Sequence, residues 1–268
     1  MGADTKQLRT RIKSVDSTLH LTKAMGLVAS SKIRKALDSM FKGKEFSDAL
    51  EEIIAMLSTY DECKRSPYMQ EKEEGNVRLI VVAGDRGLAG GYNANVFRLL
   101  RELDKNARIT PIGKRACDKF SKEVVRAEGY SYEEAIALAN ELCKDFVEGN
   151  CNKVGIVCTK YNSMMSQEAQ VKWILPLKKS EGRESVGAIF EPDEASVLNA
   201  IIPEYIAGVI ISSVKESFAS EVAARRVAMD SAGKNAQEMI NNLELEYNRA
   251  RQGAITQEIT EIVAGSGI

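Results

Sequence analysis

The sequence predicts an α/β protein in which long N- and C-terminal helices form an antiparallel coiled coil, with an α/β domain inserted between them. Two observations predict the coiled coil: each end of the chain carries a stripe of apolar and small residues that recurs in alternating steps of four and three. A third observation predicts the inserted domain, because the region between the stripes alternates short apolar runs with amphipathic segments.

The N-terminal segment, residues 1–60, is predicted to be one long helix. A spacing that averages about 3.5 residues keeps one face toward a partner helix and gives a left-handed supercoil. No proline precedes Pro67, so the helix can continue to about Leu57. At about 1.5 Å per residue, such a helix is roughly 75–80 Å long. The stripe consists of Leu8, Ile12, Val15, Leu19, Thr22, Gly26, Ala29, Ile33, Ala36 and Met40.

The C-terminal segment, residues 203–268, is predicted to be the partner helix. No proline follows Pro203, and Gly265 and Gly267 provide an end signal. Small residues in both stripes allow the two backbones to approach closely. The alternative is that two separate amphipathic helices pack on the middle domain, but that domain is too short to cover both stripes. The second stripe consists of Met229, Gly233, Ala236, Ile240, Leu243, Tyr247, Ala250 and Ala254.

The end of the C-terminal helix is apolar beyond the last residue of its stripe. An apolar helix end with no partner left in its own chain indicates that another protein encloses it. The sequence therefore predicts a protein partner at this tip, which is formed by Ile255, Ile259, Ile262 and Val263.

The middle of the chain, residues 76–190, is predicted to be a Rossmann-like α/β domain with a mostly parallel sheet. Strands are expected at 77–83, 109–112, 153–159 and 169–177, and helices at 92–105, 114–122 and 132–147. Ser131 is a suitable N-cap for the last of these helices, because Glu133 and Glu134 follow it. Polar segments at 71–75 and 178–185 connect the domain to the terminal helices.

A glycine-rich motif, Gly-Asp-Arg-Gly-Leu-Ala-Gly-Gly-Tyr-Asn at 84–93, follows the first predicted strand and precedes a helix. Nucleotide-binding folds place phosphate loops in this position. However, the spacing matches neither the dinucleotide fingerprint nor the P-loop. The motif is either a ligand-binding loop or a tight structural turn, in which Asp85 and Arg86 pair with each other or with a partner chain.

Composition argues against several other classes of protein. The formal net charge of −1 gives no overall attraction to nucleic acid. No apolar run approaches the ~20 residues of a membrane-spanning helix, and lysine and arginine interrupt any signal peptide. His20 is the one histidine and lies outside any cluster of metal ligands, and the five cysteines are interpreted as buried thiols in a reducing compartment. No catalytic set emerges, and no cofactor or metal is expected.

The first forty-odd residues are rich in lysine and arginine, among them Lys6, Arg9, Lys23, Lys32 and Lys35. Such a charge distribution is typical of a solvated helix face, and it would equally suit a surface that binds an acidic partner.

Several segments resemble the signatures of the ATP synthase gamma chain family. The N-terminal segments are 13–18, 21–25 and 28–36, the central one is the glycine motif, and the C-terminal ones are 224–232 and 247–265. The resemblance is strong over about the first 40 and last 60 residues and weaker in most of the middle. Ala89 stands where many members carry Cys, and the chain lacks the paired-cysteine insert of chloroplast members, so redox control of rotation is not expected.

The resemblance implies a non-catalytic subunit of a rotary F-type ATP synthase. Its terminal helices would form the central rotor shaft inside a hexamer of alpha and beta subunits, and the catalytic sites would lie mainly on beta. Its α/β domain would contact the membrane c-ring and the epsilon subunit. The complex would lie at the cytoplasmic face of the plasma membrane. Rotation would couple ion transport, such as proton transport, to ATP synthesis.

The resemblance also implies roles for individual residues. Arg251, Gln252 and Thr256 match a polar catch on the beta subunits, and Arg226, Met25 and Lys23 match lower contacts with beta. Ile255, Ile259, Ile262 and Val263 match a bearing at the tip. Phe190 and Glu191 match a foot segment near the ring and epsilon.

Two other functions remain open from the sequence. One is a non-rotary coiled-coil scaffold with an α/β head, which the heptads alone would allow. The other is a nucleotide-binding α/β enzyme with long helical arms.

Overall fold

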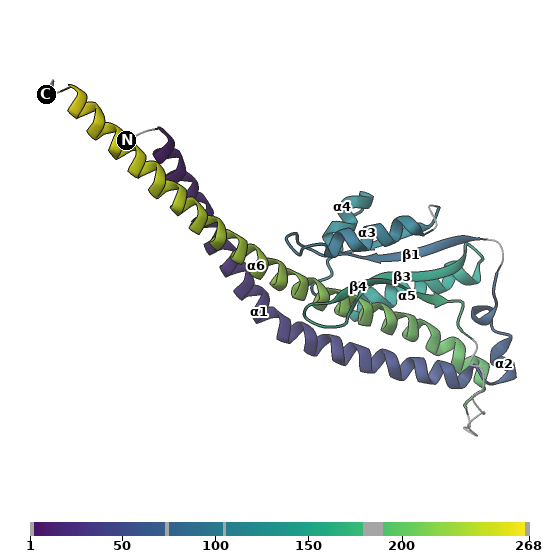
Figure 1. Cartoon of the computed structure of the whole chain (residues 1–268). Coiled ribbons are helices and arrows are strands. Elements are labelled where there is room, and N and C mark those ends of the chain that lie inside the picture. The colour runs from purple at the N-terminus through teal and green to yellow at the C-terminus, as the bar shows by residue number, and fades with distance from the viewer. Residues whose placement is uncertain (1–2, 73–74, 104–105, 179–189, 266–268) are drawn as a thin grey trace. The chain divides into compact units, whose positions relative to one another are not determined.

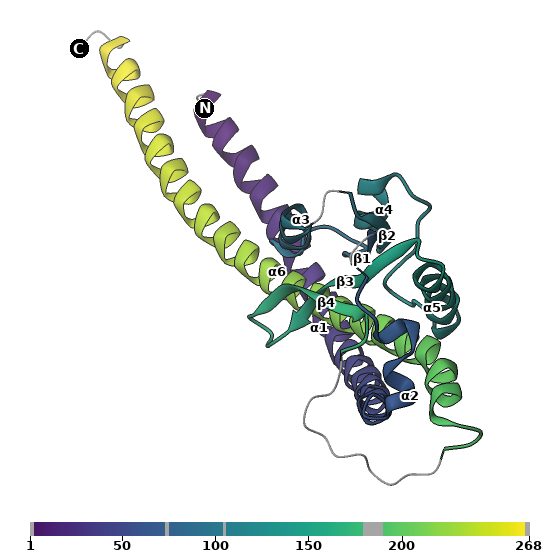
Figure 2. The ribbon, with the colours of Figure 1, turned by 90° about the vertical axis from the view of Figure 1, so that its right-hand side faces the viewer.

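The computed structural model describes residues 3–72, 75–103, 106–178 and 190–265, and its elements are shown in Figures 1 and 2. The chain divides into two compact units, and the two longest helices contribute to both. We call Met1–Ser30 with Arg225–Ile268 the helical unit, and Ser31–Ala224 the sheet unit. The elements are α1 (Ala3–Leu57), α2 (Asp61–Lys64), η1 (Pro67–Met69), β1 (Asn76–Val82), α3 (Tyr92–Glu102), β2 (Arg108–Ile112), α4 (Lys114–Phe120), α5 (Tyr132–Val147), β3 (Cys151–Tyr161), β4 (Gln167–Leu175) and α6 (Glu194–Gly265).

In the helical unit, α1 and α6 pair in antiparallel orientation, as the two stripes predict. Gly26 lies opposite Met229, and Thr22 lies opposite Gly233, so residue numbers fall along α1 as they rise along α6. Leu19 packs with Ala236 and Ile240 in a buried cluster. The residues of both stripes are buried or half-buried, whereas most of the residues between successive stripe positions along each helix are exposed.

The same pairing continues in the sheet unit. Ala36 and Met40 of α1 pack with Ala219 of α6. Leu50 lies against Gly208, where a Cβ atom would come within 2.8 Å of the leucine Cδ1. The prediction of an antiparallel pair is therefore confirmed in each unit.

The C-terminal helix is longer than the sequence predicted. We expected the helix to begin at residue 203, but α6 begins at Glu194, has 72 residues and contains Pro203. Asp193 caps its start by accepting hydrogen bonds from the backbone N–H and the hydroxyl of Ser196, both at 2.8 Å. Both bonds lower the pKa of Asp193, and the bond from the backbone N–H has the larger effect. The proline is tolerated because Leu198, Ile202 and Ile206 anchor this part of α6 in the core.

One stretch of α6 is apolar enough to cross a membrane by length and composition alone. An 18-residue window has a mean hydropathy of 1.7, contrary to the expectation that no apolar run reaches this length. In the structure 61% of the window is buried, much of it in the core of the sheet unit.

The sheet has the strand order β2-β1-β3-β4. β1 pairs in parallel with β2 and β3, and β3 pairs antiparallel with β4. Side chains of β1 alternate between two cores: Ile80 and Val82 face one, and Leu79 and Val81 face the other. The expected mostly parallel sheet is confirmed, and each predicted strand and helix of the middle domain is present.

Helices cover both faces of this sheet. α3 and α4 lie on one face, whereas α5, α1 and α6 lie on the other (Figures 1 and 2). α5 has the predicted bounds, and Ser131 forms a capping box with Glu134 at its start. The carboxyl ends of β1 and β3 consequently lie against α6, and the glycine motif is located there.

Candidate functional site

The glycine motif forms the turn between β1 and α3. Gly84 N–H donates to Asn93 Oδ1 at 2.9 Å, which closes the turn. The N–H groups of Asp85 and Arg86 donate to the carboxylate of Glu221 on α6 at 3.2 and 3.3 Å. Amides that would bind a phosphate in a nucleotide fold therefore bind a carboxylate of the chain itself.

Asp85 of the motif binds backbone, and does not pair with Arg86 as one interpretation expected. Its carboxylate accepts hydrogen bonds from the N–H groups of Lys114, Ala127 and Glu128 at 3.0, 3.1 and 2.7 Å. Arg86 forms an ion pair with Glu128 instead, at 3.4 Å. These contacts support the interpretation of the motif as a structural turn, because its polar groups bind the surrounding segments.

Polar residues on one face of α6 bind the carboxyl ends of the neighbouring strands. Ser217 Oγ accepts from Thr159 N–H at 3.0 Å, and Ser220 Oγ donates to Thr159 O at 3.3 Å. Glu216 accepts from Tyr161 N–H at 3.1 Å. Ser217, Ser220 and Glu221 are each at most 1% exposed. We call Glu216, Ser217, Ser220 and Glu221 the polar stripe.

Tyr92 connects the polar stripe to α3. Its hydroxyl donates to the carbonyl oxygen of Ser217 at 2.9 Å. Burial, and secondly the charge of Glu221, raise the pKa of Tyr92 far above its usual value. The tyrosine therefore keeps its proton and remains a hydrogen-bond donor at neutral pH.

Gly84 permits the close approach of α6 to this turn. A Cβ atom at this position would lie 2.8 Å from Cδ of Glu221, well inside van der Waals contact. Any larger residue would therefore displace the carboxylate from the two N–H groups that it binds.

Sequence reasoning missed the polar stripe. The signal was present, because Glu216, Ser217, Ser220 and Glu221 recur at helical spacing within a mostly apolar helix. A polar face on a helix normally indicates solvent, and only the fold reveals that strand ends and a helix start cover this one.

The predicted lower contacts with beta lie in the helical unit. Lys23 is exposed, whereas Met25 and Arg226 are half-buried. The guanidinium of Arg226 lies over Gly26, 3.3 Å from the position that a Cβ atom would take. Arg226 is therefore near the turn of α1 that carries Lys23 and Met25.

The predicted catch residues lie further along α6. Arg251, Gln252 and Thr256 are all exposed. The hydroxyl of Thr256 donates to the carbonyl oxygen of Gln252 at 3.0 Å. The three residues thus lie on one exposed stretch of helix, about seven turns beyond Arg226 at 3.6 residues per turn.

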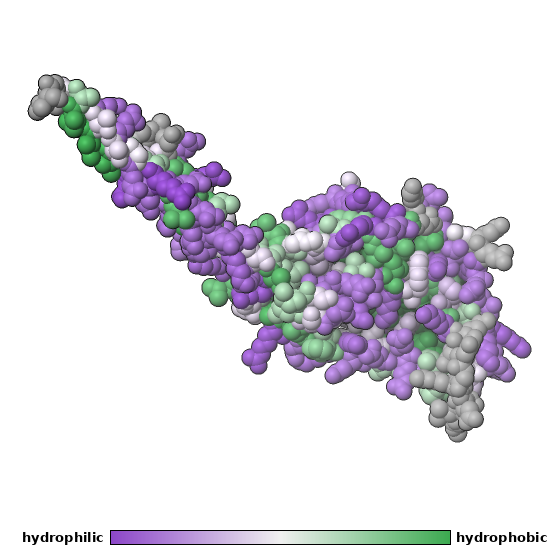
Figure 3. All heavy atoms as spheres, viewed as in Figure 1, coloured by the Kyte–Doolittle hydropathy of each residue, from purple (hydrophilic) through white to green (hydrophobic). Residues whose placement is uncertain are grey.

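The apolar tip of α6 is exposed in this chain. Ile255, Ile259, Ile262 and Val263 are 47, 56, 70 and 62% exposed. Figure 3 shows apolar residues on this end of the helical unit. Apolar side chains with this exposure indicate a surface that another protein covers.

The predicted foot residues precede α6. Phe190 is half-buried and packs edge-to-face against Tyr60, with ring centroids 5.5 Å apart. Glu191 is exposed. Part of Phe190 therefore contributes to the core of the sheet unit, and Glu191 is the more accessible of the two.

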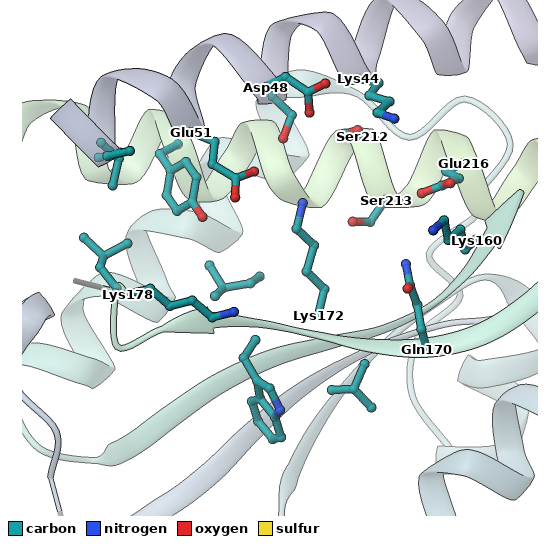
Figure 4. A pocket seen from close by; sticks show the side chains of 18 of the residues that line it. Lys44, Asp48, Glu51, Lys160, Gln170, Lys172, Lys178, Ser212, Ser213 and Glu216 are labelled. Atoms are coloured by element: carbon teal, nitrogen blue, oxygen red, sulfur yellow. The ribbon is translucent and has the colours of Figure 1, made fainter. Parts of the chain in front are cut away.

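A cleft of about 540 Å³ lies between β4 and the parts of α1 and α6 that belong to the sheet unit (Figure 4). Lys172 extends from β4 toward the two helices, with Glu51 on one side and Ser213 on the other. The charged residues of the cleft have both signs and include exposed Lys44, Lys160 and Lys178. Across the described ranges, no cluster of three or more His, Cys, Asp or Glu residues could hold a metal ion.

The fold and these surfaces define a class of protein: two long antiparallel helices with an α/β domain inserted between them in the chain, and an exposed apolar end on the C-terminal helix. The family model described as ATP synthase matches residues 4–267. ATP synthase gamma chains of Ruminococcus albus and Moorella thermoacetica are 42% and 36% identical to this chain, each over 98% of both sequences. This chain belongs to the ATP synthase gamma chain family.

Solved structures have the same fold. A chain from the rotor of Euglena gracilis mitochondrial ATP synthase aligns with a TM-score of 0.65 and 16% identity, covering 95% of this chain and all of that one. A chain from the OSCP/F1/c-ring structure of the same enzyme has a TM-score of 0.69 and 17% identity, covering 100% and 97%. At these identities the likeness concerns the fold alone.

Proposed function

We infer that this chain is the central rotor shaft of an F-type ATP synthase. It couples ion-driven rotation of a membrane ring to ATP synthesis, or ATP hydrolysis to ion pumping, at catalytic sites on beta subunits. The observation that carries this inference is the match to gamma chains over nearly the whole length of both sequences. The chain itself is not catalytic.

The mechanism rests on the asymmetry of a two-helix shaft. A pair of helices has no threefold axis, so it presents a different face to each of three beta subunits. A face drives a conformational change only if it binds the open and closed states with different affinity. Rotation therefore takes each catalytic site in turn through substrate binding, synthesis and release.

The apolar tip functions as the bearing of the shaft. Hydrophobic contacts have no preferred direction, so a surface of Ile255, Ile259, Ile262 and Val263 can turn inside an apolar sleeve without breaking oriented bonds. The exposure of these residues supports this role. The sleeve is formed by the hexamer of alpha and beta subunits.

The polar residues below the tip function as catches on beta. The guanidinium of Arg251 can form bidentate hydrogen bonds with a carboxylate, and Gln252 can donate and accept beside it. Both are exposed and lie on consecutive positions of α6, near Thr256. Lys23, Met25 and Arg226 form the lower contacts, where basic side chains face acidic beta loops.

The sheet unit forms the foot, which contacts the c-ring and the epsilon subunit. Glu191 provides an exposed carboxylate for this contact, and Phe190 fixes the segment to the core. The assembled complex is peripheral at the cytoplasmic face of the plasma membrane.

Co-expression with the alpha and beta subunits of the same organism tests this function. We expect a stable complex whose ATPase activity depends on this chain. A complex that forms but shows no rotation would favour the scaffold, and tight nucleotide binding by this chain alone would favour the enzyme.

The catch is tested by Arg251→Ala combined with Gln252→Ala in the holoenzyme. We expect impaired coupled ATP synthesis, with thermal unfolding of the chain unchanged because both side chains are exposed. Wild-type synthesis by this variant would contradict the catch assignment.

A further inference from the structure

We propose that the polar stripe of α6 is the torque anchor of the rotor, the contact that prevents the shaft helix from turning relative to the sheet of the foot. The proposal rests on the proposed function and adds to it a set of positioning residues. Its basis is a helix face with buried Ser217, Ser220 and Glu221 and half-buried Glu216, which binds backbone groups of the sheet unit.

The polar stripe binds the foot at three separate places. Glu221 binds the turn after β1, through the N–H groups of Asp85 and Arg86. The other three residues bind the end of β3, through Thr159 and Tyr161. The third place is the start of α3, where Tyr92 binds the backbone of Ser217. Contacts at three places on one helix face fix both its rotation about its axis and its position along it.

Hydrogen bonds suit this task better than apolar packing does. The strength of a hydrogen bond falls steeply when the angle between donor, hydrogen and acceptor drops below about 120°. A rotation of α6 about its axis would therefore weaken the hydrogen bonds of the polar stripe together. Apolar contacts resist separation but have no preferred direction. Burial adds to the effect, because a displaced Glu221 would leave a carboxylate that is only 1% exposed without these two hydrogen bonds.

The glycine motif gives α1 a similar but weaker attachment. Asp85 binds the N–H groups of Ala127 and Glu128 and so holds the segment before α5. The side chain of Glu128 in turn forms an ion pair with Lys32 of α1 at 2.5 Å. This pair is partly exposed, so we expect it to contribute little compared with the buried polar stripe.

Torsional stiffness is the quantity that tests the proposal. In the complex with alpha and beta subunits, a bead is attached to Asn140→Cys on α5. This position is exposed, whereas the five native cysteines are buried. The catalytic sites are blocked by a non-hydrolysable nucleotide. The angular variance of the bead then varies inversely with the torsional stiffness of the shaft and of its attachment to the foot. Glu221→Gln combined with Ser217→Ala should raise this variance about twofold, because fewer and weaker oriented bonds then resist rotation.

A matched control separates stiffness from stability. Ser131→Ala removes the capping box of α5, so it destabilises the same unit by about 1 kcal/mol without touching α6. We expect its angular variance to equal that of the wild type. If Glu221→Gln with Ser217→Ala fails to fold, Glu216→Gln with Ser220→Ala provides a milder variant that should raise the variance less.

The outcomes distinguish the anchor from the proposed function. Wild-type beads that do not rotate with ATP would contradict the rotor function itself. Wild-type beads that rotate, together with folded polar-stripe variants whose variance equals that of the wild type, would overturn the anchor alone. An equal increase in the Ser131→Ala control would also overturn it, because the effect would then follow stability.

Discussion

Two regions of α6 invert the usual placement of polar and apolar side chains. The polar stripe is buried: Ser217, Ser220 and Glu221 are almost inaccessible and bind backbone groups. The tip is apolar and exposed, and Ile262 is 70% accessible. In an ordinary surface helix, the polar face meets water and the apolar face meets the core.

The two proposed roles account for this difference. A part of a rotor that transmits torque needs contacts with a fixed orientation, and buried hydrogen bonds provide them. A part that turns within a stationary sleeve needs contacts without orientation, and apolar surface provides those. One helix thus holds the two kinds of contact at different positions along its length.

The largest effect on the polar stripe should come from Gly84→Ala. The new Cβ would lie 2.8 Å from Cδ of Glu221 and displace the buried carboxylate from two N–H groups. We expect the free energy of unfolding of the full chain to fall by about 2–4 kcal/mol. Urea denaturation measures this change.

The double variant Gly84→Ala with Glu221→Ala provides the control for this steric explanation. Shortening residue 221 removes the clash, so the two effects should not add, and the coupling energy should be about 1–3 kcal/mol. Additive effects would show that the glycine is needed for another reason.

Much of the fold could be predicted from the sequence because its signals are local. The stripes through Leu19 and Ile240 specify the paired helices, and Ser131 with Glu134 specifies the start of α5. The alternation of strands and helices specifies a mostly parallel sheet. The start of α6 could not be predicted in this way, since burial of its neighbours overrides the local effect of Pro203.

The candidate site also has one part that could be predicted from the sequence and another that could not. The exposed tip was predicted from its position beyond the stripe, and the structure bears out its exposure. The polar stripe was not predicted, because Glu221 and Asp85 are 136 residues apart in the chain and meet only in the fold. The roles of Arg251 and Gln252 remain predictions, since their partners lie on other chains.

A second variant examines a single hydrogen bond of the polar stripe. Ser217→Ala removes the acceptor of Thr159 N–H and leaves that donor buried. The expected loss of stability is about 1–3 kcal/mol. Ser39→Ala on the half-buried surface of α1 is the matched serine control and should change little. Equal losses in the two variants would indicate that the position of Ser217 in the polar stripe is unimportant.

Alkaline pH should weaken the polar stripe through Tyr92. The pKa of this buried hydroxyl is raised in the folded chain, so its stabilising effect is complete below the unfolded value of 10.0 and is lost as the pH rises above it. Above pH 10, stability should fall by up to about 1.4 kcal/mol per pH unit for this group. Tyr92→Phe should make the measured slope shallower by that amount, and an unchanged slope would contradict this explanation.

The smallest effect on the chain itself should come from the tip. Ile259→Ser combined with Ile262→Ser alters side chains that are already 56 and 70% exposed, so the free energy of unfolding should change by no more than about 0.5 kcal/mol. Ile206→Ala, in the buried part of the same helix, should cost about 2–5 kcal/mol. The order should reverse in the assembled complex, where the tip variant should weaken binding to the alpha and beta subunits in a pull-down titration. Unchanged affinity would mean that the exposed apolar tip is not a bearing surface. The proposed functional difference between the two regions of α6 would then hold only for the polar stripe.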